Sequence, residues 1–169
     1  MTLTAPAGRF QLLAAAFLAL AMAGTVGTAL GFEHIGGFIP CALCLEQRIP
    51  YYIGAPLMAL AVLAAWMNLP GIVIRLLLLA GAGLMAGGLV LGIYHSGVEW
   101  HWWAGPADCS GAAFQTKDVN DLFSDLSKRP PSCDQAAGRF LGLSFAGWNV
   151  FASAFLMAVA LKGAFGRKA

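Results

Sequence analysis

Four long apolar segments limit what this chain can fold into. Uncharged runs at residues 10–32, 49–67, 76–98 and 140–161 each come close to the ~20 residues that a helix needs to cross the hydrocarbon of a bilayer. Of the 169 residues, 59% are hydrophobic and only 11% are charged, well outside the composition of a soluble domain. We therefore predict an integral membrane protein.

The segments are rich in Ala, Leu and Gly and lack the alternation of barrel strands, which favours helices. We predict an all-α integral membrane protein with one domain, residues 1–169, built as a four-helix transmembrane bundle. Its helices are expected at about residues 10–32, 46–67, 73–95 and 140–162, with outer loops at 33–45 and 96–139. Two small-xxx-small pairs in the third segment predict close helix packing there: Gly83 with Gly87, and Gly88 with Gly92.

Two details of this architecture have alternatives. Ala21-Met22-Ala23 resembles the cleavage site of a secretory signal, but the apolar run continues to residue 32, which favours a retained first helix. In the long outer loop, residues 118–129 carry apolar residues at helical spacing and predict a short amphipathic helix. This helix would lie on the outer leaflet or act as a small lid over the bundle.

The charges give the expected orientation. All eight acidic residues and all four cysteines fall between the first and second apolar runs or between the third and fourth. The ten basic residues divide equally between the two sides, so the positive-inside rule gives no majority. Setting aside Arg48 as a candidate site residue and the basic residues in mid-loop, we place both termini in the cytoplasm. The cysteines then lie on the outer side, where disulfides persist.

Cys41 and Cys44 form a Cys-x-x-Cys motif at the head of the second helix, with Arg48 four residues further on. A disulfide closing so short a ring adds only about 2 kcal/mol of chain-entropy stabilisation, against about 3.5 kcal/mol for a 25-residue ring. The pair is better suited to a redox switch than to a structural staple. If the chain is helical from Cys44 on, Arg48 lies one turn below it, where its charge would favour the reactive thiolate.

The second pair, Cys109 and Cys133, lies in the long outer loop with 23 residues between the two. Zinc sites favour closely spaced cysteine pairs or added histidines, so we expect no metal ion. Haem attachment needs a histidine directly after the second cysteine of the motif, where Leu45 stands instead. Inert disulfides would suit the loop pair but would leave the Cys-x-x-Cys without a purpose. A thiol–disulfide relay is therefore favoured, from a soluble dithiol protein through the loop pair and the membrane pair to a carrier in the bilayer.

The chain resembles the DsbB family of bacterial disulfide bond formation proteins over nearly its whole length. The resemblance is carried by Pro40-Cys41-x-Leu43-Cys44 with Arg48 at the head of the second helix, by a histidine at the end of the third, by the loop cysteine pair, and by Phe140-Leu141-Gly142-Leu143 ahead of the fourth. It implies a quinone-dependent protein-disulfide oxidoreductase of the bacterial inner membrane that reoxidises a DsbA-like periplasmic thiol oxidase.

The resemblance also implies an order of steps for the four catalytic cysteines. A reduced DsbA-like protein would attack the Cys109–Cys133 disulfide and form a mixed disulfide through Cys109. Cys133 would then attack Cys41, which frees Cys44 as a thiolate beside the quinone. The implied partners are the thiol oxidase, the membrane quinone and the lipid bilayer, with no nucleic acid.

The implied cofactor is ubiquinone or menaquinone, bound by Cys44, Arg48 and His95. His101 is a rival for His95, while His34 is expected to be a solvated loop residue. Arg48 could instead extend to lipid phosphate, and His95 could be an ordinary interfacial histidine at a helix end.

Two other functions stay open. The vitamin K epoxide reductase family also combines four helices, a reactive dithiol and quinone chemistry, but its Cys-x-x-Cys lies late in the chain, so it ranks second. The non-enzymatic alternative is a four-helix membrane scaffold held by two inert disulfides.

Overall fold

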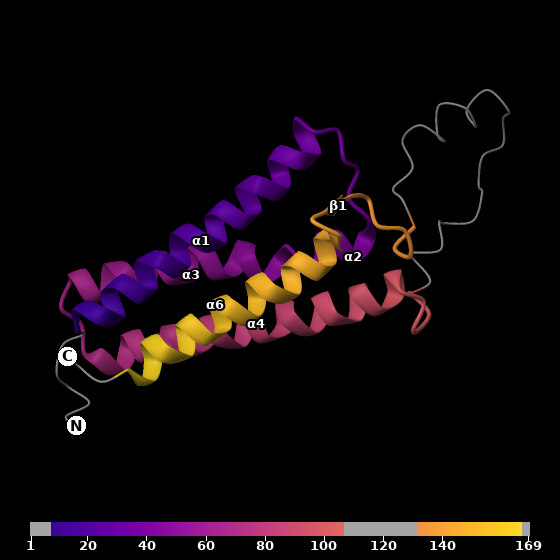
Figure 1. The fold of residues 1–169 in the computed structure, drawn as a ribbon. Helices are drawn as coiled ribbons and strands as arrows, with labels where there is room; N and C mark the ends of the chain where they lie inside the picture. The colour runs from indigo at the N-terminus through magenta and orange to yellow at the C-terminus, as the bar shows by residue number, and fades with distance from the viewer. Residues whose placement is uncertain (1–7, 107–131, 167–169) are drawn as a thin grey trace, which may run out of the picture.

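The computed structural model describes residues 8–106 and 132–166. Four long helices run along the molecule (Figure 1): α1 (Arg9–His34), α3 (Ile49–Trp66), α4 (Gly71–Glu99) and α6 (Phe145–Phe165). All four are long and apolar enough to cross a membrane, α3 together with the short helix α2 (Ala42–Glu46) that precedes it. The predicted all-α four-helix membrane fold is confirmed. The amphipathic helix expected at 118–129 lies outside the described residues.

The helices pack in a ring of pairs, with α4 against α6, α1 against α3, and α3 against α4. The side chains at the centre of the bundle are fully buried and come from these helices: Leu18, Met22, Met58, Leu78 and Met85. Many large apolar side chains point outward instead, among them Leu13, Leu20 and Trp66. An outer surface this apolar is suited to lipid contact and would be an aggregation hazard in water.

Of the two glycine pairs in the third helix, only the second packs against a neighbour. A Cβ added at Gly88 would lie 3.0 Å from Ser153 Oγ, and one at Gly92 would lie 3.1 Å from a Val150 methyl, both on α6. Gly83 and Gly87 meet nothing within 4 Å. The close approach of α4 to α6 therefore depends on Gly88 and Gly92, as expected for small residues in membrane helices.

The fourth helix begins at Phe145 rather than at residue 140. Before it, β1 (Arg139–Phe140) and β2 (Leu143–Ser144) form a short antiparallel hairpin. The turn residues Leu141 and Gly142 have φ of 51° and 84°, in the left-handed region that such tight turns need. The Ser144 side chain then accepts a hydrogen bond from the Gly147 amide at 3.1 Å and caps the new helix.

The second and third helices also differ from the expected limits. The helix predicted at 46–67 starts at Ile49 instead, after the separate short helix α2, because Pro50 has no N–H to donate to the carbonyl of Glu46. The third helix runs from Gly71 to Glu99 instead of 73–95. Its extra turn carries Glu99 one helical turn beyond His95.

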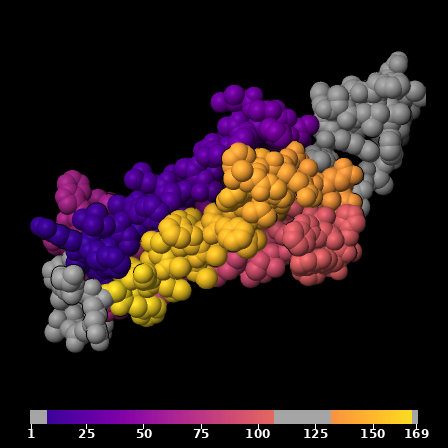
Figure 2. All heavy atoms as spheres, in the orientation of Figure 1, coloured from indigo at the N-terminus to yellow at the C-terminus, as the bar shows by residue number. Residues whose placement is uncertain are grey.

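The two ends of the bundle are different. α1 begins and α6 ends at one end, while α2 and the hairpin gather at the other (Figure 1). In Figure 2 the orange segment that includes the hairpin lies between the violet chain that follows α1 and the salmon end of α4. The cysteines described below lie at this second end.

Candidate functional site

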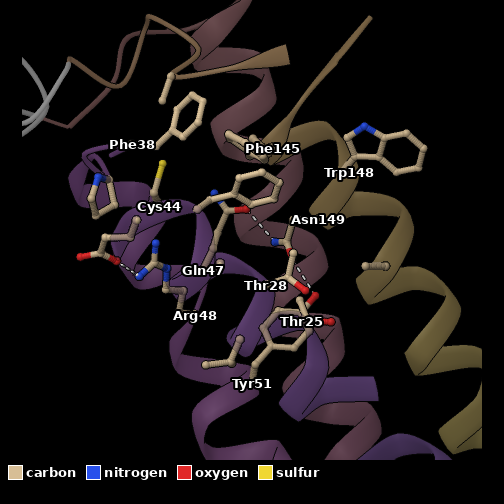
Figure 3. Close-up of a pocket in the computed structure, with 18 of the residues that line it drawn as sticks. Thr25, Thr28, Phe38, Cys44, Gln47, Arg48, Tyr51, Phe145, Trp148 and Asn149 are labelled. Carbon is tan, nitrogen blue, oxygen red and sulfur yellow. Dashed lines mark hydrogen bonds and ion pairs between the residues drawn. The ribbon is translucent and has the colours of Figure 1, made fainter. Parts of the chain in front are cut away.

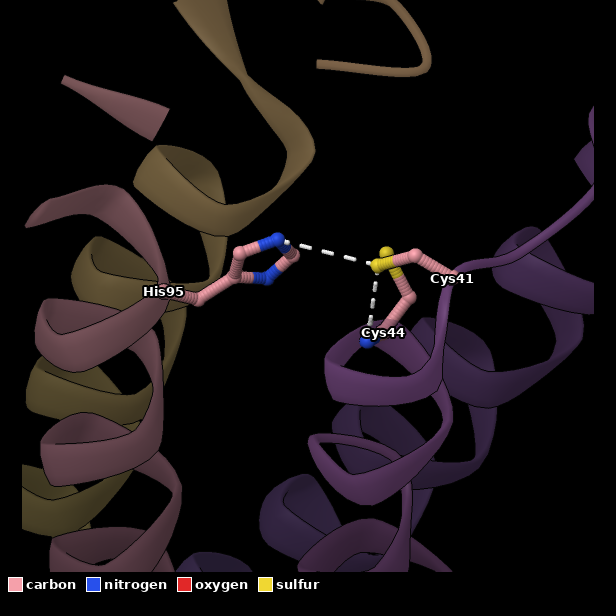
Figure 4. A group of neighbouring side chains, drawn as sticks. All are labelled: Cys41, Cys44 and His95. Atoms are coloured by element: carbon pink, nitrogen blue, oxygen red, sulfur yellow. Dashed lines mark hydrogen bonds between the residues drawn. The ribbon is translucent and has the colours of Figure 1, made fainter. Parts of the chain in front are cut away.

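Helix α2 presents both thiols of the Cys-x-x-Cys motif. Cys41 is its N-cap residue, with an extended backbone (φ −76°, ψ 171°), and its Sγ accepts a hydrogen bond from the Cys44 amide at 3.2 Å. Both cysteines are free thiols, Cys41 buried and Cys44 partly exposed. Their sulfur atoms lie within 4.8 Å of each other (Figure 4). A dithiol held within one helical turn can close to a disulfide with little movement of the backbone.

His95 reaches the thiols from α4 and is almost fully buried. Its Nε2 lies 3.7 Å from Cys41 Sγ, and its Nδ1 lies 2.6 Å from Nε2 of Gln47 (Figure 4 shows the first contact). The Gln47 oxygen accepts a hydrogen bond from Asn149 at 2.6 Å, so its NH₂ group faces the ring. Nδ1 is then the acceptor and Nε2 carries the ring proton toward the Cys41 sulfur.

Cys41 is the acidic thiol of the pair. Its hydrogen bond with Cys44 lowers the pKa of Cys41 from 9.0 to about 5, and the hydrogen bond with His95 adds to this effect against the opposing cost of burial. The position of Cys41 at a helix N-terminus favours its thiolate as well. From the sequence, Cys44 is instead expected to be the thiolate, because of the charge of Arg48.

Arg48 lies on the same side of the chain as Cys44, but its charge is paired with Glu33 rather than with the thiol. It falls in the break between α2 and α3, and its guanidinium forms an ion pair with Glu33 near the end of α1. The pair joins α1 to the start of α3. Arg48 and Cys44 still share one feature, because both line the cavity described next.

A cavity of about 550 Å³ opens beside Cys44 between α1, α3 and α6. Figure 3 shows its wall of aromatic side chains, with Cys44 and Arg48 at its edge. The aromatic residues that line it are Phe32, Phe38, Phe140, Phe145 and Trp148. Among the described residues, neither Cys41 nor His95 contributes to this lining. The two sulfur atoms of the motif therefore face different surroundings.

The cavity also has a polar side that the sequence analysis missed. Tyr51 donates a hydrogen bond to the Asn149 side-chain oxygen at 2.6 Å and lies 2.9 Å from Ser153 Oγ. Through Gln47, Asn149 connects this group to His95. The sequence does contain a signal for this group, because Asn149 and Ser153 lie within an apolar membrane segment. Polar side chains inside membrane helices are costly and often belong to functional sites.

Cys133 brings the second cysteine pair to the first. It is fully buried and disulfide-bonded, and it packs with Cys41, Leu43 and Val98 in a small cluster. Cys109 lies outside the described residues. The disulfide-bonded Cys133 therefore shares one buried cluster with Cys41, and Cys44 packs against the same cluster.

Glu99 is the second site residue that the sequence analysis missed. Its side chain is only 4% exposed, and its Oε1 lies 3.8 Å from Nε2 of His95. Its other oxygen, Oε2, is buried and has no hydrogen-bond partner within residues 8–106 and 132–166. Cys41, Cys44 and His95 have donor atoms of the types that bind zinc, all within 4.8 Å of one another.

The fold and the site define a class of protein: a four-helix membrane protein with a dithiol at one end of the bundle. The family model for Disulfide bond formation protein DsbB matches residues 11–162. Disulfide bond formation protein B of Marinobacter nauticus is 32% identical over 152 residues, which cover 84% of each chain. No solved structure matches the chain. The chain belongs to the DsbB family, and it is thus a membrane disulfide bond formation protein with a thiol oxidoreductase role.

Proposed function

We propose that this chain, as one four-helix domain over residues 1–169, reoxidises a DsbA-like dithiol protein and passes the electrons to a membrane quinone. One observation carries the proposal: one dithiol lies between the second cysteine pair and an apolar cavity. Cys41 and the disulfide-bonded Cys133 belong to one buried cluster, and Cys44 packs against that cluster and also lines the cavity between membrane helices. Such a pair can receive electrons on one side and deliver them on the other.

The relay that we propose begins at a Cys109–Cys133 disulfide. A thiolate of the partner protein attacks Cys109, which forms a mixed disulfide and releases Cys133 as a thiolate. Cys133 then attacks Cys41 of the oxidised Cys41–Cys44 pair and releases Cys44. The second thiol of the partner protein attacks the partner sulfur that is bound to Cys109, which closes the partner's disulfide and releases Cys109 as a thiolate. Cys41 and Cys133 are both buried members of one cluster, whereas Cys44 lies at its edge, which supports this choice of sulfur.

Closing the relay restores both disulfides of the chain. The Cys133–Cys41 mixed disulfide is resolved by the Cys109 thiolate, which leaves Cys41 and Cys44 as the reduced pair. Cys41, kept as a thiolate near neutral pH, is then the sulfur that attacks when the pair closes onto Cys44. In total, two partner thiols become a disulfide, and two electrons and two protons leave through Cys44.

The cavity beside Cys44 fits a quinone ring. Its volume of about 550 Å³ lies within the usual range for small-molecule sites, and its lining combines an aromatic wall with a few polar groups. Cys44 and Arg48 would hold the ring side, and a bound ubiquinone or menaquinone supplies the two-electron, two-proton acceptor. His95, absent from the lining, acts instead on Cys41, where it donates to the sulfur and stabilises its thiolate.

A reconstituted assay tests this function. The purified protein is mixed with a reduced DsbA-like protein and a soluble quinone, and quinol formation is followed for each of the four Cys→Ser variants. We expect Cys44→Ser to abolish quinol formation while helix content and expression are retained. Full quinol formation by that variant would refute the proposed electron path, and no turnover by the wild type would favour an inert scaffold.

We also propose that the thiols face the periplasm and that the termini lie in the cytoplasm. The basic residues Arg9, Arg75 and Lys162 lie at or beside helix ends at the other end of the bundle, as expected for cytoplasmic flanks. A membrane-impermeant thiol reagent applied to intact inner-membrane vesicles of both orientations checks this. Labelling of the outer-loop cysteines only from the cytoplasmic face would overturn the orientation.

A further inference from the structure

Three donor groups meet where α2 approaches the end of α4, and a fourth lies beside the third. Two thiols come from one turn of α2, and an imidazole and a carboxylate come from successive turns of α4. We propose that Cys41, Cys44, His95 and Glu99 form a binding site for Zn²⁺ in the reduced protein. This inference goes beyond the proposed function, because metal binding here requires neither a quinone nor a partner protein.

The spacing of the donor atoms is close to that of a zinc site. With Zn–S and Zn–N bonds of about 2.3 and 2.0 Å, the ligand atoms of a tetrahedral site lie roughly 3.3–3.8 Å apart. Cys41 Sγ to His95 Nε2 measures 3.7 Å, and His95 Nε2 to Glu99 Oε1 measures 3.8 Å. Both distances are close to this spacing, and the sulfur of Cys44 lies within 4.8 Å of Cys41 Sγ and of a ring nitrogen of His95. Glu99 lies outside this group of three, and it would complete the tetrahedron by a rotation of its carboxylate toward the two sulfurs.

Glu99 is the second, independent observation that points to a cation. A carboxylate buried in a membrane helix is costly unless it is paired or bound to a metal. Among the described residues, its single ion-pair partner is His95, at 3.8 Å, and its Oε2 has no hydrogen-bond partner at all. A divalent cation bound to the neighbouring thiols would give this carboxylate the counter-charge that it lacks.

The surroundings of His95 suit a metal ligand. A ligating histidine usually has its second nitrogen held by an acceptor, and the Gln47 amide lies 2.6 Å from Nδ1. Turning the Gln47 and Asn149 amides over together keeps the hydrogen bond between them, places the Gln47 oxygen at Nδ1–H and leaves a lone pair on Nε2, the nitrogen that faces Cys41 and Glu99. The ring proton moves from Nε2 to Nδ1, so binding releases protons only from a thiol that is still protonated, with no change in oxidation state.

The site exists only in the reduced protein, because a Cys41–Cys44 disulfide removes both thiolates. Zn²⁺ would therefore hold the dithiol in its reduced form and prevent it from closing. If the proposed function is correct, this makes Zn²⁺ an inhibitor of quinol formation, but the binding itself is measured without turnover.

Binding of Co²⁺, a coloured substitute for Zn²⁺, tests the site directly. The full chain with Cys109 and Cys133 replaced by alanine is reduced in detergent and titrated with Co²⁺, and the thiolate-to-metal charge-transfer absorption is followed. Zn²⁺ added afterwards should displace the cobalt. We expect one ion per chain in the reduced protein and none after the Cys41–Cys44 disulfide has been closed.

Two substitutions on α4 assign the remaining ligands. Loss of an outer-shell partner alone weakens metal binding by 10–100-fold, so Glu99→Gln and His95→Gln should each weaken it about tenfold or more. Glu46→Gln, at an exposed acid on the same short helix α2, is the matched control and should bind as tightly as the parent. Absence of a charge-transfer band, equal binding by the disulfide form, or unchanged affinity in both α4 variants would each overturn the site.

Discussion

The acidity of Cys41 gives the sharpest test of the site geometry. With a pKa of about 5, Cys41 is about 99% thiolate at pH 7, whereas a thiol with the ordinary value of 9.0 is about 1% thiolate. The geometry therefore predicts a roughly hundredfold larger thiolate population. We expect this in the full chain with Cys109 and Cys133 replaced by alanine and the remaining pair reduced. The ultraviolet absorbance of thiolate, compared with the same protein carrying Cys41→Ser, isolates the titration of Cys41.

The structural causes of the shift predict how variants behave. Removing Cys44 deletes the largest cause and should raise the Cys41 midpoint most, while His95→Gln should raise it less. His101→Gln, at an exposed histidine at the same end of the bundle, is the control and should leave the midpoint in place. A midpoint near 9 in the parent protein, or equal midpoints in the His95 and His101 variants, would refute the reasoning.

The same shift makes the stability of the reduced protein depend on pH. The folded-state pKa of Cys41 lies below its ordinary value, so the thiolate stabilises the fold fully above pH 9.0, and this contribution is lost as the pH falls through about 5. The difference in unfolding midpoint between the parent and Cys41→Ser should therefore be larger at pH 8 than at pH 5. A difference that grows toward low pH would contradict the lowered pKa.

Three further predictions concern the cavity, the relay and the packing. Arg48→Ala should lower quinone turnover about tenfold or more, because a hydrogen bond to a charged group contributes about 1.5–3 kcal/mol. Binding of the partner protein should be unchanged, and equal losses of turnover and of binding would count against this division. Cys133→Ser should trap the DsbA-like protein as a mixed disulfide through Cys109, visible on a non-reducing gel, whereas an adduct through the membrane pair would reverse the proposed order. Gly92→Leu should lower the free energy of unfolding by about 1–3 kcal/mol, because the new leucine side chain would meet α6. Gly87→Leu should have little effect, and equal losses in the two variants would show that the close contact at Gly92 does not determine stability.

Much of the fold follows from the sequence because lipid imposes strict rules. Only helices or closed barrels satisfy the backbone in hydrocarbon, so four apolar runs of adequate length already predict a four-helix bundle. The limits of the helices depend on finer chemistry. Pro50 separates α2 from α3, and the turn at Leu141 and Gly142 delays the start of the fourth helix to Phe145. Neither boundary can be read from hydropathy.

The site was predictable only in part, because its residues come from different helices. The Cys-x-x-Cys motif and Arg48 are close in sequence, and the motif alone indicates redox chemistry. The place of His95 beside Cys41 rather than at the cavity depends on how α4 packs against α2. Likewise, spacing along the chain gives no sign that His95 approaches the thiols through space.

The central claim is that the Cys41–Cys44 dithiol delivers its electrons to a quinone. A single-turnover experiment tests it most directly: the chain with Cys109 and Cys133 replaced by alanine is reduced, freed of reductant and mixed with a soluble quinone, and quinol and remaining thiols are counted together. The account predicts one quinol formed for every two thiols lost, and none with Cys44→Ser. Loss of thiols without quinol, or unchanged thiols in the presence of excess quinone, would contradict it.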